Sequence, residues 1–246
     1  MKVCDSRLPD AQAEAPVPQQ RGYLIWDFDG TLGYRPGQWS GAMVQVAQRF
    51  AGLDVDLETV RPYMRKGSPW HNPSLPNPPM RAPDDWWNGL LPVFEEAFIG
   101  CRISSEQAST LATKVRSVYT DVSEWRLYDD TLVTLRELGA EGWNHAILSN
   151  HVPELPLLIH GLGLDLLVDH VVNSAETGFE KPHPGAFQAV LAKLQDPAEI
   201  WMIGDNIEAD FFGAESAGLS AILVRSFDVR AGRRADSLRE VRQFLG

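Results

Sequence analysis

The sequence predicts an α/β protein with a Rossmann-like parallel sheet core, helices on both faces of the sheet, and a helical cap domain. Three observations indicate this fold class. Short apolar runs alternate with helical segments, polar residues follow three of those runs, and one long stretch after the first run has helical patterns without a convincing buried strand. Strands that alternate with helices form a parallel sheet that is covered on both faces.

Five short apolar runs are expected to be the buried strands of this sheet. The helical segments between them carry start and stop signals, because Gly139 and Gly218 follow two of them and Pro184 begins another. The expected strands are 23–26, 144–148, a run within 166–172, 200–203 and 221–224, and the expected helices are 130–138, 184–194 and 207–217.

The stretch after the first strand interrupts this alternation. Helical patterns cover 40–50, 86–99 and 105–119. Eight of the 17 prolines lie between Pro62 and Pro92, so the segment 67–85 is expected to be a long loop. The helices should pack as a small bundle whose core contains Phe50, Trp86, Phe94, Phe98, Leu111 and Val115.

These patterns predict a core domain interrupted by an insert. The first residues are rich in Ala, Pro, Gln and Asp, a composition typical of a disordered tail. We therefore expect a tail at 1–20, an α/β core at 21–33 and 127–246, and a helical cap insert at 34–126.

The composition restricts the class of partner. A net charge of -11 disfavours binding to nucleic acid or to an anionic membrane, whereas a local cation can still admit a small anionic substrate. The two cysteines are too few for a disulfide framework or a cysteine metal cluster. No apolar run approaches the roughly 20 residues of a membrane span, and the first 20 residues lack the apolar stretch of a signal peptide. A cytoplasmic protein is therefore expected.

Four aspartates are associated with the ends of expected strands. Asp27 and Asp29 stand two apart after the first strand, so both can lean to one side of an extended segment. Asp205 follows the fourth strand, and Asp210 lies in the first turn of the next helix. The carboxyl ends of parallel strands form a common crevice. Four carboxylates meeting there call for a cation, and oxygen ligands suit Mg²⁺.

A charge count sharpens this interpretation. The four aspartates give -4, Lys181 adds +1, and a magnesium ion would add +2, which leaves -1 before a dianionic phosphate arrives. One carboxyl group therefore has reason to keep a proton, because clustered like charges raise a pKa. A protonated carboxyl can act as a general acid, while a carboxylate held against a metal can attack phosphorus.

Four short motifs occur in a fixed order. They are Asp27-Phe28-Asp29-Gly30-Thr31-Leu32, Leu148-Ser149-Asn150, Lys181-Pro182, and the segment from Gly204-Asp205 to Asp210. Together they resemble the motifs of the haloacid dehalogenase-like hydrolase superfamily, in the phosphatase branch with a helical cap inserted after the first motif. The resemblance covers Gly22 to about Arg225, although the insert matches only in position and helical character.

The resemblance implies a role for each residue. Asp27 would be the nucleophile that forms an aspartyl-phosphate, and Asp29 the general acid and base. Asp27, Asp29 (through its backbone carbonyl) and Asp205 would bind Mg²⁺, with Asp210 supporting the metal shell. The phosphate would be bound by Phe28, Gly30, Ser149, Asn150 and Lys181, although Asn150 could equally serve as a strand-end turn residue.

The presence of Asp29 also distinguishes phosphate ester hydrolysis from dehalogenation. True dehalogenases of the superfamily lack the second aspartate of the first motif and need no metal, so its presence points to phosphate esters. The sequence therefore predicts a magnesium-dependent phosphatase that acts on a small phosphorylated metabolite. A phosphomutase with the same phosphoenzyme, or a non-catalytic binding module with the same fold, are the alternatives.

Substrate choice is expected to depend on the insert, which begins shortly after Asp29. Residues 64–87 are the hypothesised specificity segment, with Arg65, Trp86 and Trp87 as candidate contacts. Three histidines, His71, His151 and His183, fit no ligand motif and are expected to lie on the surface or in loops.

Overall fold

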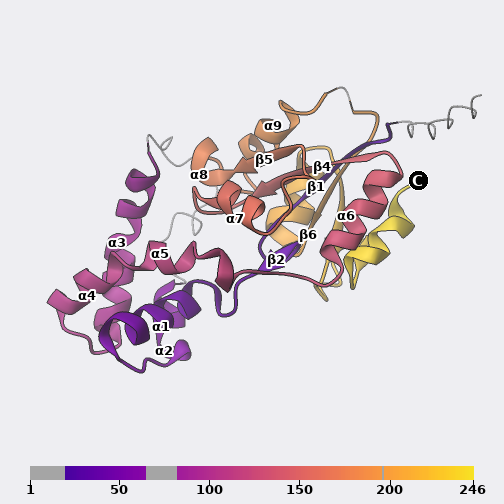
Figure 1. Cartoon of the computed structure of the whole chain (residues 1–246). Helices are drawn as coiled ribbons and strands as arrows, with labels where there is room; N and C mark the ends of the chain where they lie inside the picture. The colour runs from indigo at the N-terminus through magenta and orange to yellow at the C-terminus, as the bar shows by residue number, and fades with distance from the viewer. Residues whose placement is uncertain (1–19, 65–81, 196) are drawn as a thin grey trace, which may run out of the picture.

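A six-stranded parallel sheet forms the centre of the computed structural model, which describes residues 20–64, 82–195 and 197–246. The strand order is β5-β4-β1-β6-β7-β8, so the first strand along the chain lies in the interior of the sheet (Figure 1). The strands are β1 (Gly22–Trp26), β4 (Trp143–Ser149), β5 (His170–Asn173), β6 (Ile200–Gly204), β7 (Ser220–Val224) and β8 (Arg234–Ala235).

Both faces of the sheet are buried. In β1, Leu24 and Trp26 belong to one hydrophobic cluster, while Tyr23 and Ile25 belong to a second cluster on the opposite face. The alternation follows from the pleat of a strand. The first face is covered by α6 (Thr131–Ala140), α7 (Leu155–Gly161) and η4 (Leu238–Phe244), and the second by α9 (Pro184–Leu191), the π-helix η3 (Ile207–Phe212) and α10 (Gly213–Ser216).

The parallel α/β core predicted from the sequence is confirmed, and each of the five apolar runs forms or contains a strand. Several features were not expected. They include the short edge strand β8, the antiparallel pair β2 (Gly33–Tyr34) and β3 (Arg126–Leu127), and the π-helical start of the expected helix at 207–217. The single helix expected at 105–119 is wrong, because it is interrupted after Ala112, and the helices at 57–64, 155–161 and 174–177 were not predicted. Two-residue strands are too short to show an alternating pattern, and a π-helical turn has no sequence signature of its own.

Between β2 and β3 the chain forms a helical cap domain, which extends away from the sheet (Figure 1). Its central helix α3 places Leu90, Phe94, Ala97 and Phe98 on one buried face, at the spacing of an amphipathic helix. The elements are α1 (Gln38–Ala51), α2 (Leu57–Met64), α3 (Pro83–Gly100), α4 (Ser105–Ala112), α5 (Val115–Tyr119) and the short η2 (Val122–Glu124). In the described part of the chain, no helix is both long enough and apolar enough to cross a membrane.

The predicted core of the insert is correct in four of its six members, since Phe94, Phe98, Leu111 and Val115 are buried. The prediction that Phe50 is buried is wrong, because it lies near the end of α1 with 51% of its surface exposed. Trp86 is only partly buried, and its neighbour Trp87 takes the core position.

The expected loop at 67–85 is wrong at its end, because Pro83 to Asp85 already form the first turn of α3. Proline fits that turn since its missing N–H would have no helical partner there. The remainder of that loop, 67–81, and residues 1–19 of the expected tail lie outside the described residues. The exact domain boundaries stay a prediction.

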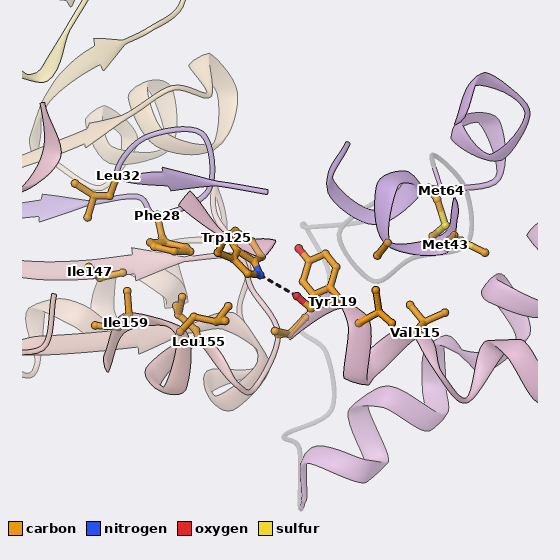
Figure 2. Packing of buried hydrophobic residues seen from close by; sticks show 14 of the residues in the cluster. Phe28, Leu32, Met43, Met64, Val115, Tyr119, Trp125, Ile147, Leu155 and Ile159 are labelled. Carbon is orange, nitrogen blue, oxygen red and sulfur yellow. Dashed lines mark hydrogen bonds between the residues drawn. The ribbon is translucent and has the colours of Figure 1, made fainter. Parts of the chain in front are cut away.

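An aromatic contact joins the sheet to the helices of the insert. Trp125 lies between Phe28, two residues after the end of β1, and Tyr119 at the end of α5 (Figure 2). Its ring centroid is 5.4 Å from that of Phe28 and 5.5 Å from that of Tyr119. The Trp125 Nε1–H also donates to the Tyr119 backbone oxygen at 2.8 Å. One hydrophobic cluster therefore continues from the sheet into the insert.

Candidate active site

Three carboxylates meet at the carboxyl ends of two neighbouring strands. Asp27 follows β1, Asp205 follows β6, and these strands pair directly. The Asp27 N–H donates to the Ile203 carbonyl at 2.9 Å, which extends the sheet pairing to the site. With Asp210 in η3, Asp27 and Asp205 offer carboxylate oxygens that all lie within 4.8 Å of one another. The structure thus brings together three of the four predicted acids.

Two glycines make room for these carboxylates. A Cβ on Gly204 would lie 2.2 Å from Asp210 Oδ2, and a Cβ on Gly30 would lie 2.4 Å from Asp205 Oδ2. Gly30 also has a φ of +91°, which side chains other than glycine rarely adopt. Any larger residue at either position would displace a carboxyl group of the site.

Lys181 is the cation of this cluster in the described structure. Its Nζ donates to Asp27 Oδ1 at 2.8 Å and to Asp210 Oδ1 at 2.6 Å, and only 3% of the residue is exposed. Burial alone would lower the pKa of the amine, but the charges of Asp210 and Asp27 raise it. Lys181 therefore carries its charge at neutral pH.

Ser149 and Asn150, at the end of β4, hold other parts of the site. The Ser149 hydroxyl donates to Asp27 Oδ1 at 2.9 Å. The Asn150 side chain donates to the Lys181 carbonyl at 2.9 Å and accepts from the Lys181 N–H at 2.8 Å. Asn150 thereby fixes the loop that carries Lys181, and it also lines the adjacent pocket. Its predicted contact with phosphate stays a prediction.

The predicted phosphate contacts in the first motif are both close to the acids. Phe28 is fully buried and packs edge-on against His151, with ring centroids 5.5 Å apart. The Gly30 N–H donates to the Gly33 carbonyl at 2.8 Å, so this amide already closes the turn. Their role in binding phosphate stays a prediction.

Asp29 lies apart from the other three acids and faces the pocket. Burial, followed by the charge of Asp27, raises the pKa of its carboxyl group to about 7, against smaller opposing effects of Gln38 and Arg35. Its Oδ1 atom is enclosed and has no hydrogen-bond partner among the described residues. Both protonation states of Asp29 are thus populated near neutral pH, and its enclosed Oδ1 atom lacks a partner beside the pocket.

The cluster of Asp27, Asp205 and Asp210 has more negative charge than Lys181 can neutralise. Burial and the nearby charges of Asp27, Asp210 and Asp29 raise the pKa of Asp205, and burial raises the pKa of Asp210 despite its pairing with Lys181. Both Asp210 oxygens are already engaged, by Lys181 and by the Asn206 N–H at 3.0 Å. These oxygen donors fit a divalent cation such as Mg²⁺, with Asp27 and Asp205 better placed than Asp210 to bind it directly.

A pocket opens beside Asp29, between the core and the insert. Among the described residues of the insert, three aromatic side chains line it: Trp39, Trp86 and Tyr119. Trp39 and Tyr119 are stacked with ring centroids 3.8 Å apart and an angle of 9° between their planes. The core contributes Asp29, Asn150 and His151, among others.

The three residues predicted to determine specificity have different positions in the structure. Trp86 lines the pocket. Trp87 is turned away from it, and its Nε1–H donates to the Glu154 carboxylate at 3.2 and 3.1 Å. Arg65 lies outside the described residues.

Three pocket residues were missed or misjudged by sequence reasoning. Trp39 and Tyr119 belong to no motif, and they meet only through the packing of α1 against α5. His151 was expected to lie on the surface or in a loop. A surface position is wrong, because only 6% of the residue is exposed. Its position directly after Ser149-Asn150 was the one available signal.

Comparisons with known proteins agree with this geometry. The family model described as haloacid dehalogenase-like hydrolase matches residues 23–218. Haloacid dehalogenase-like hydrolase domain-containing protein 3 of Bos taurus is 27% identical over 206 residues, which are 82% of this chain and 80% of that protein. Ribulose-1,5-bisphosphate 5-phosphatase of Halopiger xanaduensis is 40% identical over 104 residues, 42% of this chain and 44% of that protein.

A solved structure shows the same fold. The HAD-hydrolase YfnB from Bacillus subtilis, bound to magnesium, is 18% identical and aligns with a TM-score of 0.72 over 92% of this chain and 99% of that chain.

Proposed function

Because the chain belongs to the haloacid dehalogenase-like hydrolase family, we propose that it is a magnesium-dependent phosphatase that hydrolyses a small phosphorylated metabolite through an aspartyl-phosphate intermediate. One observation carries this proposal. Asp27, buried at the end of β1, is held by Ser149 and Lys181, while a second carboxyl group, Asp29, lies two residues away with a pKa of about 7.

Asp27 is the proposed nucleophile. Its Oδ1 atom accepts from both the Ser149 hydroxyl and the Lys181 ammonium group, which fixes the direction of the carboxylate. A fixed carboxylate can form a bond to phosphorus with little loss of freedom, and the positive charge of Lys181 favours a phosphate nearby.

Asp29 is the proposed general acid and base. In its protonated form it donates a proton to the leaving oxygen, and the resulting carboxylate then accepts a proton from the water that hydrolyses the phosphoenzyme. A pKa of about 7 suits both steps, since both forms are populated near neutral pH. Its place on the pocket side of Asp27 is consistent with a contact to the leaving group.

Asp27 and Asp205, with the Asp29 main chain, would hold the magnesium ion, and Asp210 would support them. When bound, the ion would neutralise negative charge on the phosphoryl oxygens and on the clustered acids. The magnesium-bound structure of the Bacillus subtilis relative supports this choice of metal. The phosphatase of Halopiger xanaduensis, whose name gives a sugar bisphosphate as its substrate, supports a small phosphorylated metabolite.

The proposal is tested by phosphate release from a panel of phosphorylated metabolites in the presence of Mg²⁺. The wild-type protein should release phosphate, and Asp27→Asn should lower kcat by at least about a thousandfold because a neutral amide is a poor nucleophile. Asp54→Asn is the matched control, since Asp54 is exposed in the loop between α1 and α2.

Full activity of Asp27→Asn would contradict the nucleophile assignment. Formation of an isomeric phosphate without release of free phosphate would instead identify a phosphomutase.

A further inference from the structure

His151 is a buried polar residue whose ring nitrogens have no protein hydrogen bond of normal geometry within the described parts of the chain. The other buried core histidine, His145, shows the usual arrangement. Its Nδ1 accepts from Trp26 Nε1–H at 3.1 Å, and its Nε2 lies 2.9 Å from the Leu135 carbonyl. An enclosed imidazole without such partners is unfavourable for folding, so the arrangement at His151 calls for another explanation.

The surrounding rings fix the position of the His151 side chain. Trp125 lies 5.2 Å away between ring centroids, Phe28 5.5 Å and Tyr119 6.1 Å. Phe28 meets the imidazole at an angle of 75°, edge to face. These contacts come from both the core and the insert. The ring packing therefore holds the imidazole in place, and both of its nitrogens are enclosed without a hydrogen-bond partner among the described residues, so a ligand would meet them from the pocket that His151 lines.

The pocket beside Asp29 is the place where such a ligand would lie. His151 and Asp29 line the same pocket, and Asp29 is the group that faces the leaving oxygen in the proposed reaction. Burial lowers the pKa of the His151 imidazole to about 4, against smaller opposite effects of Asp27 and the Val152 backbone. The ring is thus neutral, and one nitrogen can donate a hydrogen bond while the other accepts one.

The wall of the pocket that the insert contributes has a different character. Trp39, Tyr119 and Trp86 present aromatic surface, and the first two are stacked upon each other. Aromatic surface of this kind favours contact with carbon and C–H groups, whereas a few placed polar groups orient a ligand. A leaving group that fits both walls has a carbon skeleton and at least one hydroxyl group.

From this geometry we infer that His151 hydrogen-bonds a hydroxyl group of the substrate's leaving group, and that the substrate is a phosphate ester of a hydroxylated carbon chain. This inference rests on the proposed phosphatase function. His151 serves in it as a specificity-determining contact, separate from the chemistry carried by Asp27 and Asp29.

The test compares phosphate esters that differ only in hydroxyl groups. Suitable pairs are glycerol 1-phosphate with propyl phosphate, and ribose 5-phosphate with 2-deoxyribose 5-phosphate. For at least one pair, the wild-type protein should show a kcat/KM that is roughly 10- to 100-fold higher for the ester with the additional hydroxyl, the range expected when a buried polar group loses its partner. His151→Phe should reduce that preference to about threefold or less, and His151→Gln should retain part of it.

Two measurements separate this role from a structural one. His151→Phe should keep or raise the thermal midpoint of unfolding, because it removes a buried imidazole without protein partners. His145→Phe is the matched control: it breaks two internal hydrogen bonds, so it should lower the midpoint while leaving the hydroxyl preference unchanged.

The outcomes distinguish the inference from the proposed function. If the wild-type protein releases phosphate from no ester, the phosphatase proposal itself fails. If it releases phosphate but prefers the deoxygenated esters, phenyl phosphate or phosphocholine, the inference is overturned and the phosphatase proposal stands. The same holds if His151→Phe keeps the wild-type preference.

Discussion

The acidic cluster at the ends of β1 and β6 and the aromatic wall contributed by the insert are built in different ways, and Asp29 is the acid that lines the pocket together with that wall. In the cluster, Asp27 and Asp210 share the Lys181 ammonium group. The wall consists of rings packed on one another, and it lines the pocket together with a histidine whose ring nitrogens have no hydrogen-bond partner among the described residues. The first region is organised by charge and the second by packing. Chemistry and substrate choice should therefore respond to different substitutions.

The largest effect is expected when the charge of Lys181 is removed. Lys181→Met leaves Asp27 and Asp210 buried without their cation, which should lower the free energy of unfolding by about 3–5 kcal/mol. Phosphate release should fall roughly 100- to 1,000-fold. Urea denaturation and steady-state kinetics measure the two effects.

Lys193→Met provides the control for Lys181→Met, because Lys193 is exposed after α9. A Lys181→Met protein that is as stable as the control would mean that the acids are not held by this lysine.

A smaller effect is expected from magnesium and pH. Asp29, Asp205 and Asp210 have raised pKa values in the folded protein, so each is protonated more readily when folded than when unfolded. In metal-free protein their contribution to stability is present at low pH and is lost as the pH rises from about 4 towards 7, the pKa of Asp29. Bound Mg²⁺ should offset this loss.

At pH 8, Mg²⁺ at a concentration of 100 Kd should therefore raise the free energy of unfolding by about 2.7 kcal/mol. The same metal concentration should raise it less at pH 5, where the acids are more protonated. Denaturation at the two pH values with and without Mg²⁺ measures this difference. Asp205→Asn should remove most of the increase, whereas Asp54→Asn should preserve it. An equal increase in Asp205→Asn would place the metal elsewhere.

The smallest effect is expected in the aromatic wall, where two adjacent tryptophans can be compared. Trp86→Ala should raise KM roughly two- to tenfold with a smaller change in kcat, because Trp86 lines the pocket. Trp87→Ala should instead lower the free energy of unfolding by about 3–5 kcal/mol, because that ring is buried in the insert. Kinetics and denaturation of both variants would show whether packing and substrate contact are divided in this way.

The same contrast explains how much the sequence could predict. The sheet was predictable because its strands are continuous apolar runs, and the acids were predictable because a strand end places Asp27 or Asp205 at the crevice by local geometry. The relation of Trp39 to Tyr119 was not predictable, since it arises from the packing of two helices 80 residues apart.

His151 and Phe50 illustrate the same limit in opposite directions. Nothing in the sequence around His151 shows that three rings will enclose it, because two of those rings come from the insert. Phe50 has a large hydrophobic side chain of the kind found in protein cores, yet it lies near the last turn of α1 on the exposed side. Hydrophobic character indicates that a residue can be buried, while its place in the helix decides whether it is.

The contact of Phe28, Trp125 and Tyr119 makes the joint between core and insert part of the pocket (Figure 2). Phe28 stands between the two aspartates of the first motif, and Tyr119 belongs to the aromatic wall. A rotation of the insert about Trp125 would swing Tyr119 and its stacked partner Trp39 while the acids remain anchored to the sheet. The joint thus ties the aromatic wall of the pocket to the strand end that carries Asp27 and Asp29.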